Sequence, residues 1–352
     1  MREMVSFLNK YLGWRNWAVL AYNSVFENMF VIFFIALRQK VDPFLFTAHF
    51  ITFLLFSTFC TTYGYLINDY CDLELDKLHD KKNTFQDDTK SKARFVVLFF
   101  LLMSVAFSLP FWENQFFLYV WLSWIVIATA YSMHPIRLKE RGKIGLIFVV
   151  IAQRVLPTLI IFTAFSYYKI IDVGLLTSYI LFRGLSSDIN HQLEDYHNDS
   201  MTGTKTYAVQ TGYSKARNIF RFSLEMEKIL LGLSLLLMSI ELSHLEIIGI
   251  PLLLPIVIFY AAVYGFNLIK IFQEKDINVN PFIPDRKDIF QFIHHAFPSV
   301  LLAFYLLVIL SIYEPLFLII LICFIIYRKM YSIDLIINSF PVRFFRNIIG
   351  SH

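Results

Sequence analysis

The sequence is poor in charged residues. Asp, Glu, Lys and Arg make up 16% of the 352 residues, whereas soluble domains average about 25%. Hydrophobic residues account for 57% of the chain, and long apolar runs recur along it. This balance excludes an ordinary soluble domain and indicates a membrane protein with several spans.

Cysteine is also scarce. The three cysteines, Cys60, Cys71 and Cys323, lie in or beside apolar runs, and none forms a Cys-x-x-Cys pair. An odd, low count of this kind predicts neither a disulfide framework nor a zinc site. The net charge of +4 says little by itself. Membrane topology and phosphate contacts explain the basic segments, so we expect no nucleic-acid partner.

The apolar runs predict an all-α fold of nine, or ten, transmembrane helices. The expected spans are residues 14–37, 44–67, 95–111, 116–131, 144–165, 173–187, 229–240, 246–268 and 298–327. The last run is too long for one straight span and is interrupted by Glu314-Pro315, so it forms either one kinked helix or two short ones. We expect one membrane domain over residues 1–352, with two pseudo-repeated halves at 14–165 and 173–327.

Basic residues are distributed unevenly between the two sides of these spans. The predicted topology places 22 Lys and Arg residues on the side where even-numbered spans end, and three on the other side. Because Lys and Arg concentrate in cytoplasmic loops, that side is expected to face the cytoplasm. The sequence therefore predicts a multi-pass protein of the cell's inner or plasma membrane.

The first acidic motif directly follows the second apolar run. Asp69, Asp72 and Asp76 have the spacing i, i+3 and i+7, so on a continuing helix they form one stripe, with Asn68 beside them. Hard oxygen ligands in this number suit Mg²⁺, which usually shares its coordination with substrate phosphates. The alternative is a solvated acidic helix end balanced by nearby lysines.

A second acidic motif follows the sixth apolar run. Asp188, Gln192, Asp195 and Asp199 are spaced by 4, 3 and 4 residues, again as one helical stripe. Gly203 is expected to end that helix, and Lys205 follows it. Taken alone, this stripe could also be a polar helix face.

The two stripes together favour a shared ligand. Two opposed rows of carboxylates can hold Mg²⁺ with a diphosphate between them, while Lys139, Arg141 and Lys205 contact the outer phosphate oxygens. The apolar spans offer a place for a hydrocarbon tail. These features predict a polyprenyl diphosphate as a substrate in the lipid bilayer.

These motifs resemble those of the UbiA superfamily of intramembrane prenyltransferases. Asn68, Asp69, Asp72 and Asp76 match its N-D-x-x-D-x-x-x-D pattern, and Asp195 and Asp199 match its D-x-x-x-D pattern. The segment from Tyr131 through Arg137 and Lys139 resembles the family's basic segment after span 4. Lys81-Lys82 stands near the place of an Arg-Pro pair that is common in the family, so Lys81 is expected to take over a phosphate contact.

The resemblance implies a helical bundle around a central cavity. It also implies Mg²⁺-dependent transfer of an isoprenoid from its diphosphate to a small lipophilic or aromatic acceptor. Six residues would bind the metal: Asn68, Asp69, Asp72, Asp76, Asp195 and Asp199. Asp69, Asp72, Asp195, Asp199, Lys139 and Lys205 are the expected catalytic residues. Tyr131, Arg137, Arg141, Arg183 and Lys81 are expected to bind substrates, although Arg183 could instead pair with Asp188 or Glu27.

Three other functions fit parts of the sequence. The same scaffold could cyclise its own isoprenoid diphosphate as a terpene cyclase, or it could transfer a phosphoribosyl group to a polyprenyl phosphate. A cation-coupled transporter would also use carboxylates, but these should then lie in the middle of the spans. Here they lie at span ends.

Overall fold

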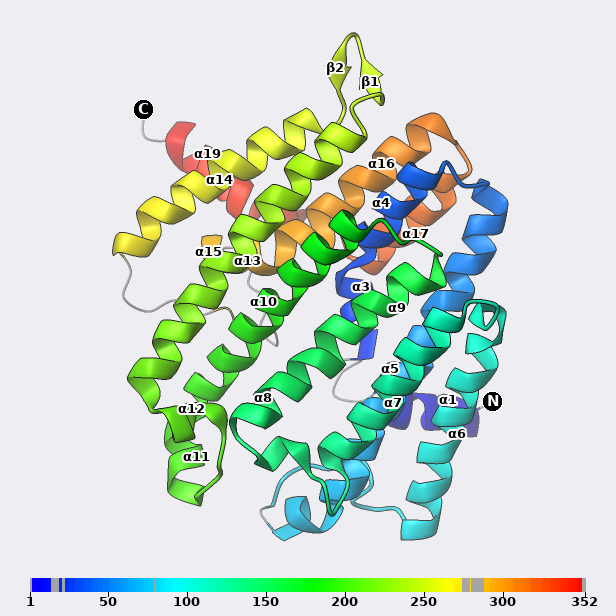
Figure 1. Ribbon diagram of the computed structural model, residues 1–352, viewed down its shortest axis with the longest axis vertical. Coiled ribbons are helices and arrows are strands. Elements are labelled where there is room, and N and C mark those ends of the chain that lie inside the picture. Colours follow the sequence, from blue (N-terminus) through cyan, green and yellow to red (C-terminus); the bar gives the residue numbers. More distant parts are fainter. Residues whose placement is uncertain are drawn as a thin grey trace. The chain divides into compact units, whose positions relative to one another are not determined.

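The computed structural model describes residues 2–349 except 14–18, 21–22, 79, 274–278 and 280–287. Apart from one short β-hairpin, its described elements are helices (Figure 1). The chain forms two compact units. Unit 1 comprises Met1–Phe26, His49–Tyr167 and Gln192–Ala216, and unit 2 comprises Glu27–Ala48, Tyr168–His191 and Arg217–His352.

Unit 1 is built around the long helix α5 (Pro43–Leu78), of which all but the first residues belong to this unit. Its other elements are α1 (Arg2–Phe7), η1 (Leu8–Leu12), α6 (Lys90–Ser108), η2 (Leu109–Phe111), α7 (Gln115–Ser132), η3 (Leu138–Glu140), α8 (Lys143–Val150), η4 (Ile151–Val155), α9 (Leu156–Ala164), α11 (Tyr196–Thr202) and α12 (Tyr207–Thr211).

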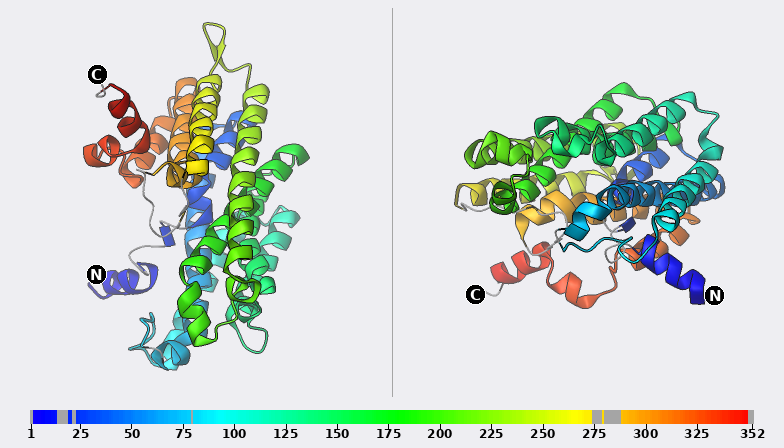
Figure 2. Two further views of the ribbon diagram at one scale, coloured as in Figure 1. Left: turned by 90° about the vertical axis from the view of Figure 1, so that its left-hand side faces the viewer. Right: turned by 90° about the horizontal axis from the view of Figure 1, so that it is seen from below.

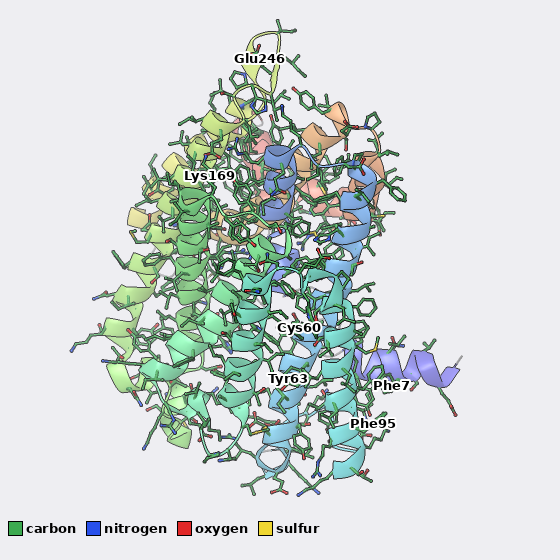
Figure 3. All side chains as sticks on the ribbon, turned by 45° about the vertical axis from the view of Figure 1, so that its right-hand side comes forward. Phe7, Cys60, Tyr63, Phe95, Lys169 and Glu246 are labelled. Carbon is green, nitrogen blue, oxygen red and sulfur yellow. The ribbon has the colours of Figure 1, made fainter. Side chains whose placement is uncertain are left out.

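Aromatic side chains pack the helices of unit 1 together. Phe59 on α5 stacks on Phe107 of α6 at 5.3 Å between ring centroids, and Phe56 meets Trp121 of α7 edge-on at 6.0 Å. The other side of α6 exposes Phe95, Leu98 and Leu102 (Phe95 is labelled in Figure 3). Because these three residues follow helical spacing and are apolar, this face suits lipid rather than water.

Unit 2 holds the remaining helices and the hairpin. Its elements are α4 (Met29–Gln39), most of α10 (Ile170–Glu194), most of α13 (Tyr213–Glu241), β1 (Glu246–Ile247), β2 (Ile250–Pro251), α14 (Leu254–Gln273), α15 (Ile289–Gln291), η5 (Phe292–Leu302), α16 (Ala303–Tyr313), α17 (Phe317–Tyr327), α18 (Ile333–Ile337) and α19 (Phe340–Ile349). The short helix α3 (Ser24–Glu27) lies where the chain passes from unit 1 to unit 2. The hairpin joins α13 to α14 and projects beyond their ends (Figures 1 and 2).

Among the described residues, six helical segments are long and apolar enough to cross a membrane. They are Pro43–Leu78, Lys90–Phe111, Gln115–Ser132, Lys143–Ala164, Ile170–Glu194 and Ile289–Tyr313. Three shorter apolar helices cover Met29–Gln39, Leu254–Lys270 and Phe317–Tyr327. Each overlaps a predicted span, but the count of nine or ten spans stays a prediction.

Some of the predicted spans differ in the structure, and the alternative left open for the last run is decided. The span expected over residues 246–268 begins with the β-hairpin, and its helix starts only at Leu254. The first span was expected over residues 14–37, but its opening lies outside the described residues and its helix is interrupted at Asn28, between α3 and α4. The last run divides into two helices, α16 and α17, because Glu314 adopts an extended backbone directly before Pro315.

Candidate functional site

The first acidic motif lies on the last turns of α5, which continues as a helix to Leu78. This confirms the expectation that the motif is helical. Its side chains nevertheless divide into two pairs. Asn68 and Asp72, four residues apart, face the loop after α7, whereas Asp69 and Asp76, seven residues apart, face the segment after α5.

Asn68 and Asp72 converge on one cation. The Lys139 ammonium donates to Asn68 Oδ1 at 3.0 Å and forms a short ion pair with Asp72 Oδ2. Ser132 Oγ also donates to Asn68 Oδ1, at 2.8 Å. Arg137 Nη2 lies 3.2 Å from Asp72 Oδ1. Two cations therefore flank one carboxylate, and Arg137 is shared with a second carboxylate, Glu140.

Arg137 is held in an unusual conformation. Its φ of 40° and ψ of 61° lie in the left-handed region, which few residues other than glycine adopt. Its guanidinium bridges Asp72 and Glu140, with Nε 2.6 Å from Glu140 Oε1. Such strain persists where surrounding contacts fix the residue, and it concentrates at functional sites.

Asp69 and Asp76 are bound by the chain that follows α5. Asp69 is only 2% exposed, and its Oδ2 accepts hydrogen bonds from Thr84 N at 3.3 Å and Thr84 Oγ1 at 2.6 Å. Asn83 Nδ2 donates to Asp76 Oδ2 and to the Asp69 carbonyl, both at 2.8 Å. These contacts pin the segment after α5 against the helix that carries the motif.

An N-terminal segment extends this attachment. Asp88 accepts from Lys10 Nζ at 2.6 Å and from the Tyr11 hydroxyl at 2.8 Å, and it pairs with Lys92 at 2.9 Å. Burial opposes ionisation of Asp88, but the hydrogen bonds from Lys10, Lys92 and Tyr11 leave its pKa below the usual value. Burial, with the hydrogen bond to Asp88, raises the pKa of Tyr11 to about 12. Tyr11 therefore stays a neutral donor at pH 7.

The second motif is divided between two helices. Helix α10 ends at Glu194, Asp195 caps the following helix, and α11 carries Asp199. The expected single helical stripe is thus interrupted at Asp195. Gly203 ends α11 in the left-handed conformation with φ 71°, as its position predicted.

The loop after α7 connects the two motifs within unit 1. It carries Lys139 to the first motif, and its Gly142 forms a parallel β-bridge with Thr206, just beyond the second motif. Gly142 has φ 54°, and a Cβ atom there would lie 1.9 Å from Gln210 Oε1. Gln192 Oε1 accepts from Ala208 N at 3.2 Å, which holds α12 to the end of α10.

The remaining predicted residues lie in varied surroundings. Lys81 and Lys205 are exposed, Tyr131 is half-buried at the end of α7, and Arg141 Nε donates to the Ile136 carbonyl at 2.8 Å. Arg183 belongs to unit 2, where it is 2% exposed and lies 3.9 Å from Glu27 Oε2. The catalytic role of Lys205 and the substrate-binding roles of the other four residues stay predictions.

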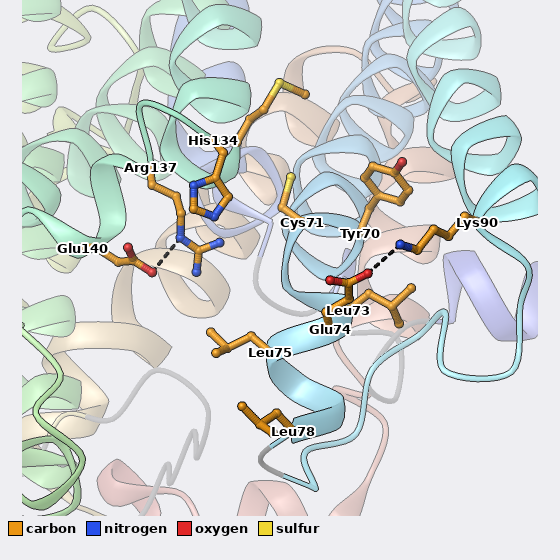
Figure 4. Close-up of a pocket in the computed structure, with 11 residues that line it drawn as sticks. Tyr70, Cys71, Leu73, Glu74, Leu75, Leu78, Lys90, His134, Arg137 and Glu140 are labelled. Atoms are coloured by element: carbon orange, nitrogen blue, oxygen red, sulfur yellow. Dashed lines mark hydrogen bonds and ion pairs between the residues drawn. The ribbon is translucent and has the colours of Figure 1, made fainter.

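An open cavity of about 690 Å³ borders the first motif (Figure 4). One side is formed by α5, through residues such as Tyr70, Cys71 and Leu75, and the other by Met133, His134 and Arg137. Arg137 separates this cavity from Asp72, since its guanidinium contacts Asp72 and also lines the cavity. The cavity therefore adjoins the Asn68–Asp72–Lys139 cluster.

The oxygen donors of this cluster fit Mg²⁺ in chemical type. Asn68 Oδ1 and Asp72 Oδ2 already point toward a shared cation, the Lys139 ammonium. Within the described part of the chain, no three His, Cys, Asp or Glu side chains lie close enough to hold a metal by themselves. Mg²⁺ commonly uses one or two carboxylates and completes its shell with water and substrate phosphates.

Sequence reasoning missed several residues of this site. Ser132, Asn83 and Thr84 fix the motif through hydrogen bonds, and Gly142 joins the two motif regions. The left-handed Arg137 also gives no sequence signal, because it is not a glycine or an asparagine.

Solved structures share this fold. A UbiA homologue from Archaeoglobus fulgidus bound to DMAPP and Mg²⁺ is 20% identical, with a TM-score of 0.56 over 84% of this chain and 98% of that one. Its structure bound to GPP and Mg²⁺ is also 20% identical, with a TM-score of 0.55 over 86% and 99% of the two chains. A search of curated proteins gave no match.

The family comparison is more specific than the fold. The model of the UbiA prenyltransferase family matches residues 28–278, a range that includes both acidic motifs and the loop between them. This agrees with the resemblance of the motifs, and the chain belongs to the UbiA prenyltransferase family.

Proposed function

We propose that the protein transfers an isoprenoid group from a polyprenyl diphosphate to a small lipophilic or aromatic acceptor in the membrane, in a Mg²⁺-dependent reaction. The observation that carries the proposal is the convergence of Asn68, Asp72 and Lys139, with Arg137 on the other oxygen of Asp72. The diphosphates and Mg²⁺ bound by the Archaeoglobus homologue support it.

We expect Asn68, Asp72, Asp195 and Asp199 to hold the metal. The sequence also predicts Asp69 and Asp76 as ligands and Asp69 as catalytic, but their carboxylates accept hydrogen bonds from Thr84 and Asn83, so in this proposal they support the site from the other side of α5. When bound, Mg²⁺ would neutralise the diphosphate and improve it as a leaving group. Lys139 would then pair with phosphate oxygens, because its present partners would be bound to the metal.

The basic residues of the site have distinct tasks in this proposal. Arg137 can bind two phosphate oxygens through its planar guanidinium, whereas Lys139 and Lys205 supply point charges. Together with Arg141 and Lys81, they would stabilise the negative charge that develops as the allylic C–O bond breaks. Tyr131 offers an aromatic face to the resulting carbocation.

The side of the membrane is also part of the proposal. The excess of Lys and Arg in the segments that carry both motifs supports a diphosphate site that opens to the cytoplasm of a cell's inner or plasma membrane. Labelling of single cysteines introduced at the exposed residues Lys81 and Lys205 in sealed vesicles tests this orientation.

The activity is tested with purified protein in nanodiscs. Geranyl, farnesyl and longer prenyl diphosphates are supplied with Mg²⁺ or with a chelator, with and without a panel of phenolic and aliphatic alcohol acceptors. We expect Mg²⁺-dependent pyrophosphate release together with a prenylated acceptor, and neither in an Asp72→Ala/Asp195→Ala variant.

The other outcomes distinguish the competing functions. Release of pyrophosphate with a cyclic product and no acceptor would show a terpene cyclase. Release only from a phosphoribosyl diphosphate donor with a polyprenyl phosphate would show phosphoribosyl transfer. No release from any donor, with normal folding, would refute the proposed class of reaction.

A further inference from the structure

The segment of unit 2 that follows α17 exposes many apolar side chains, although it lies beyond the predicted spans. On and beside α18, five large apolar residues are exposed: Tyr331, Ile333, Leu335, Ile336 and Ile337. Ile333 alone is 69% exposed, and Val342 and Phe345 of α19 are exposed as well. Apolar surfaces of this kind mark contacts with a membrane or with another molecule.

Helix α19 is attached to the rest of unit 2 by aromatic side chains on one of its faces. Phe344 meets Phe266 of α14 edge-on at 4.9 Å between ring centroids, and the rings of Phe340 and Phe292 of η5 are 5.5 Å apart. Phe340 and Phe344 are four residues apart, so they share a face of the helix. This face holds α19 beside α14 (Figure 1).

A second face of α19 is basic. Arg343 and Arg346 are three residues apart and therefore lie next to each other on the helix surface. Arg346 is exposed and Arg343 is half-buried, and neither forms an ion pair in the part of the chain that the structure describes. Lys329, also exposed, adds a third positive charge, and Asp334 is the one acidic residue between Lys329 and Arg346.

The contacts of α19 place it near one end of the apolar helices. The apolar part of α14 ends at Lys270, four residues after Phe266, and the apolar segment Ile289–Tyr313 begins three residues before Phe292. At 1.5 Å per residue, both rings lie within about 6 Å of these ends. Helix α19 therefore lies near the level at which such helices leave the hydrocarbon core of a bilayer.

These features together favour a bilayer surface as the partner of this segment. A helix with an apolar face and a face rich in Lys or Arg is typical of helices that lie in the headgroup layer. Anionic lipids attract clusters of Lys and Arg beside a membrane helix. The exposed face of the preceding helix α17, which includes Ile319, Ile322 and Ile326, also suits lipid, so the apolar surface continues along the chain.

We propose that residues 330–346 form an anchor that lies in the headgroup layer and binds anionic phospholipid through Arg343 and Arg346. Val342 and Phe345 contact the upper part of the acyl chains, and the exposed apolar residues of α18 do the same. Phe340 and Phe344 keep the anchor on unit 2. This binding is separate from the proposed prenyl transfer and does not depend on it.

The test measures hydrogen exchange in residues 330–346 of the full chain, in nanodiscs that hold one copy of the protein. The lipid is phosphatidylcholine alone or phosphatidylcholine mixed with phosphatidylglycerol. We expect exchange to slow about tenfold when phosphatidylglycerol is present, because each arginine gains from the anionic surface. This difference should disappear at about 1 M salt, which screens charges within about 3 Å.

Two double variants show whether the arginines carry the effect. Arg343→Gln/Arg346→Gln should exchange at the same rate in both lipids. Lys143→Gln/Lys215→Gln is the matched control, because it removes the same charge from two exposed positions of unit 1. This control should keep the response of the wild type.

The other outcomes overturn the proposal. Equal exchange by the wild type in the two lipids would show that the anchor does not bind anionic phospholipid, and an unchanged response in Arg343→Gln/Arg346→Gln would show that other groups bind it. Slow exchange only in nanodiscs that hold two copies would show that a second copy covers this surface. Should the arginine variant not fold, the comparison of lipids and salt in the wild type decides.

Discussion

The two acidic motifs share a sequence pattern but differ in construction. The first lies on one uninterrupted helix, and each of its side chains is bound by a neighbouring residue. The second is divided at Asp195 between two helices and ends at a left-handed Gly203. The first row of carboxylates therefore lies on one continuous helix, whereas the second row spans a break between two helices.

This difference suggests that the two acidic motifs have different roles. Asp69 and Asp76 hold the first motif to the chain that follows it, while Asn68 and Asp72 meet the cations of the loop after α7. The second motif is joined to that same loop by the Gly142–Thr206 bridge. Both motifs are therefore attached to the loop after α7.

The largest expected effect comes from Asp72. An Asp72→Ala change removes a carboxylate that two cations contact, so we expect prenyl transfer to fall about 1,000-fold, as for loss of a strong electrostatic contact in an active site. The Asp72 side chain is 13% exposed, against 2% for Asp69 as a whole residue, so we expect a smaller loss of thermal stability than for changes at Asp69. Steady-state kinetics and a melting curve check both points, and an unfolded variant would contradict the assignment.

Asp69 should behave in the opposite way. Asp69→Asn replaces a charged acceptor by a neutral one, and Thr84→Ala removes the hydroxyl donor. Both weaken buried hydrogen bonds, so we expect the free energy of unfolding to fall by about 1–3 kcal/mol. Activity at a temperature where the variant is folded should change less than tenfold. Equal loss of activity in Asp69→Asn and Asp72→Ala would remove the distinction between the two faces of α5.

A substitution at Gly203 tests whether α11 must end at this residue. Gly203→Ala places a Cβ atom on a residue with φ 71°, which costs about 1–2 kcal/mol. If α11 must end there, the Michaelis constant for the diphosphate should rise severalfold and hydrogen exchange in residues 196–205 should increase. The chain provides a control in Gly174, where a Cβ atom has open space and the backbone is helical; Gly174→Ala should leave both unchanged.

The smallest effect concerns pH. The pKa of Asp88 is lower in the folded protein than in the unfolded chain, so its ion pairs stabilise the fold above a pH of about 4. This contribution is lost as the pH falls through the lower, folded-state value. Because Lys10 and Lys92 are partly exposed, we expect less than about 1 kcal/mol.

Hydrogen exchange in residues 2–13 measures this effect. Protection in the wild type should decline between pH 5 and pH 3 more than in Asp88→Asn, which lacks the titrating group. The same decline in both proteins would show that Asp88 does not hold the N-terminal segment.

Much of the first site followed from sequence spacing. An apolar run leading into Asp69, Asp72 and Asp76 predicts a helix that continues through the motif, and α5 does so as far as Leu78. Spacing alone could not divide the row into two faces. That division depends on Lys139 and Thr84, which approach the helix from different segments.

Other features depend on contacts that sequence does not reveal. The break at Asp195 interrupts a pattern that is regular for a helix, and no proline or glycine marks it. Ser187, Glu227 and His294 are ordinary polar residues in three separate segments, and only packing within unit 2 brings their polar atoms within hydrogen-bonding distance. Single residues in such positions carry no periodic signal.

The most direct test of the account is equilibrium binding of labelled geranyl diphosphate to the protein in nanodiscs, with Mg²⁺ or with a chelator. The wild type and Asp69→Asn should both bind the diphosphate only with Mg²⁺, and Asp72→Asn should lose at least tenfold in affinity. Unchanged, Mg²⁺-dependent binding by Asp72→Asn would contradict the claim that the Asn68–Asp72–Lys139 cluster receives the diphosphate.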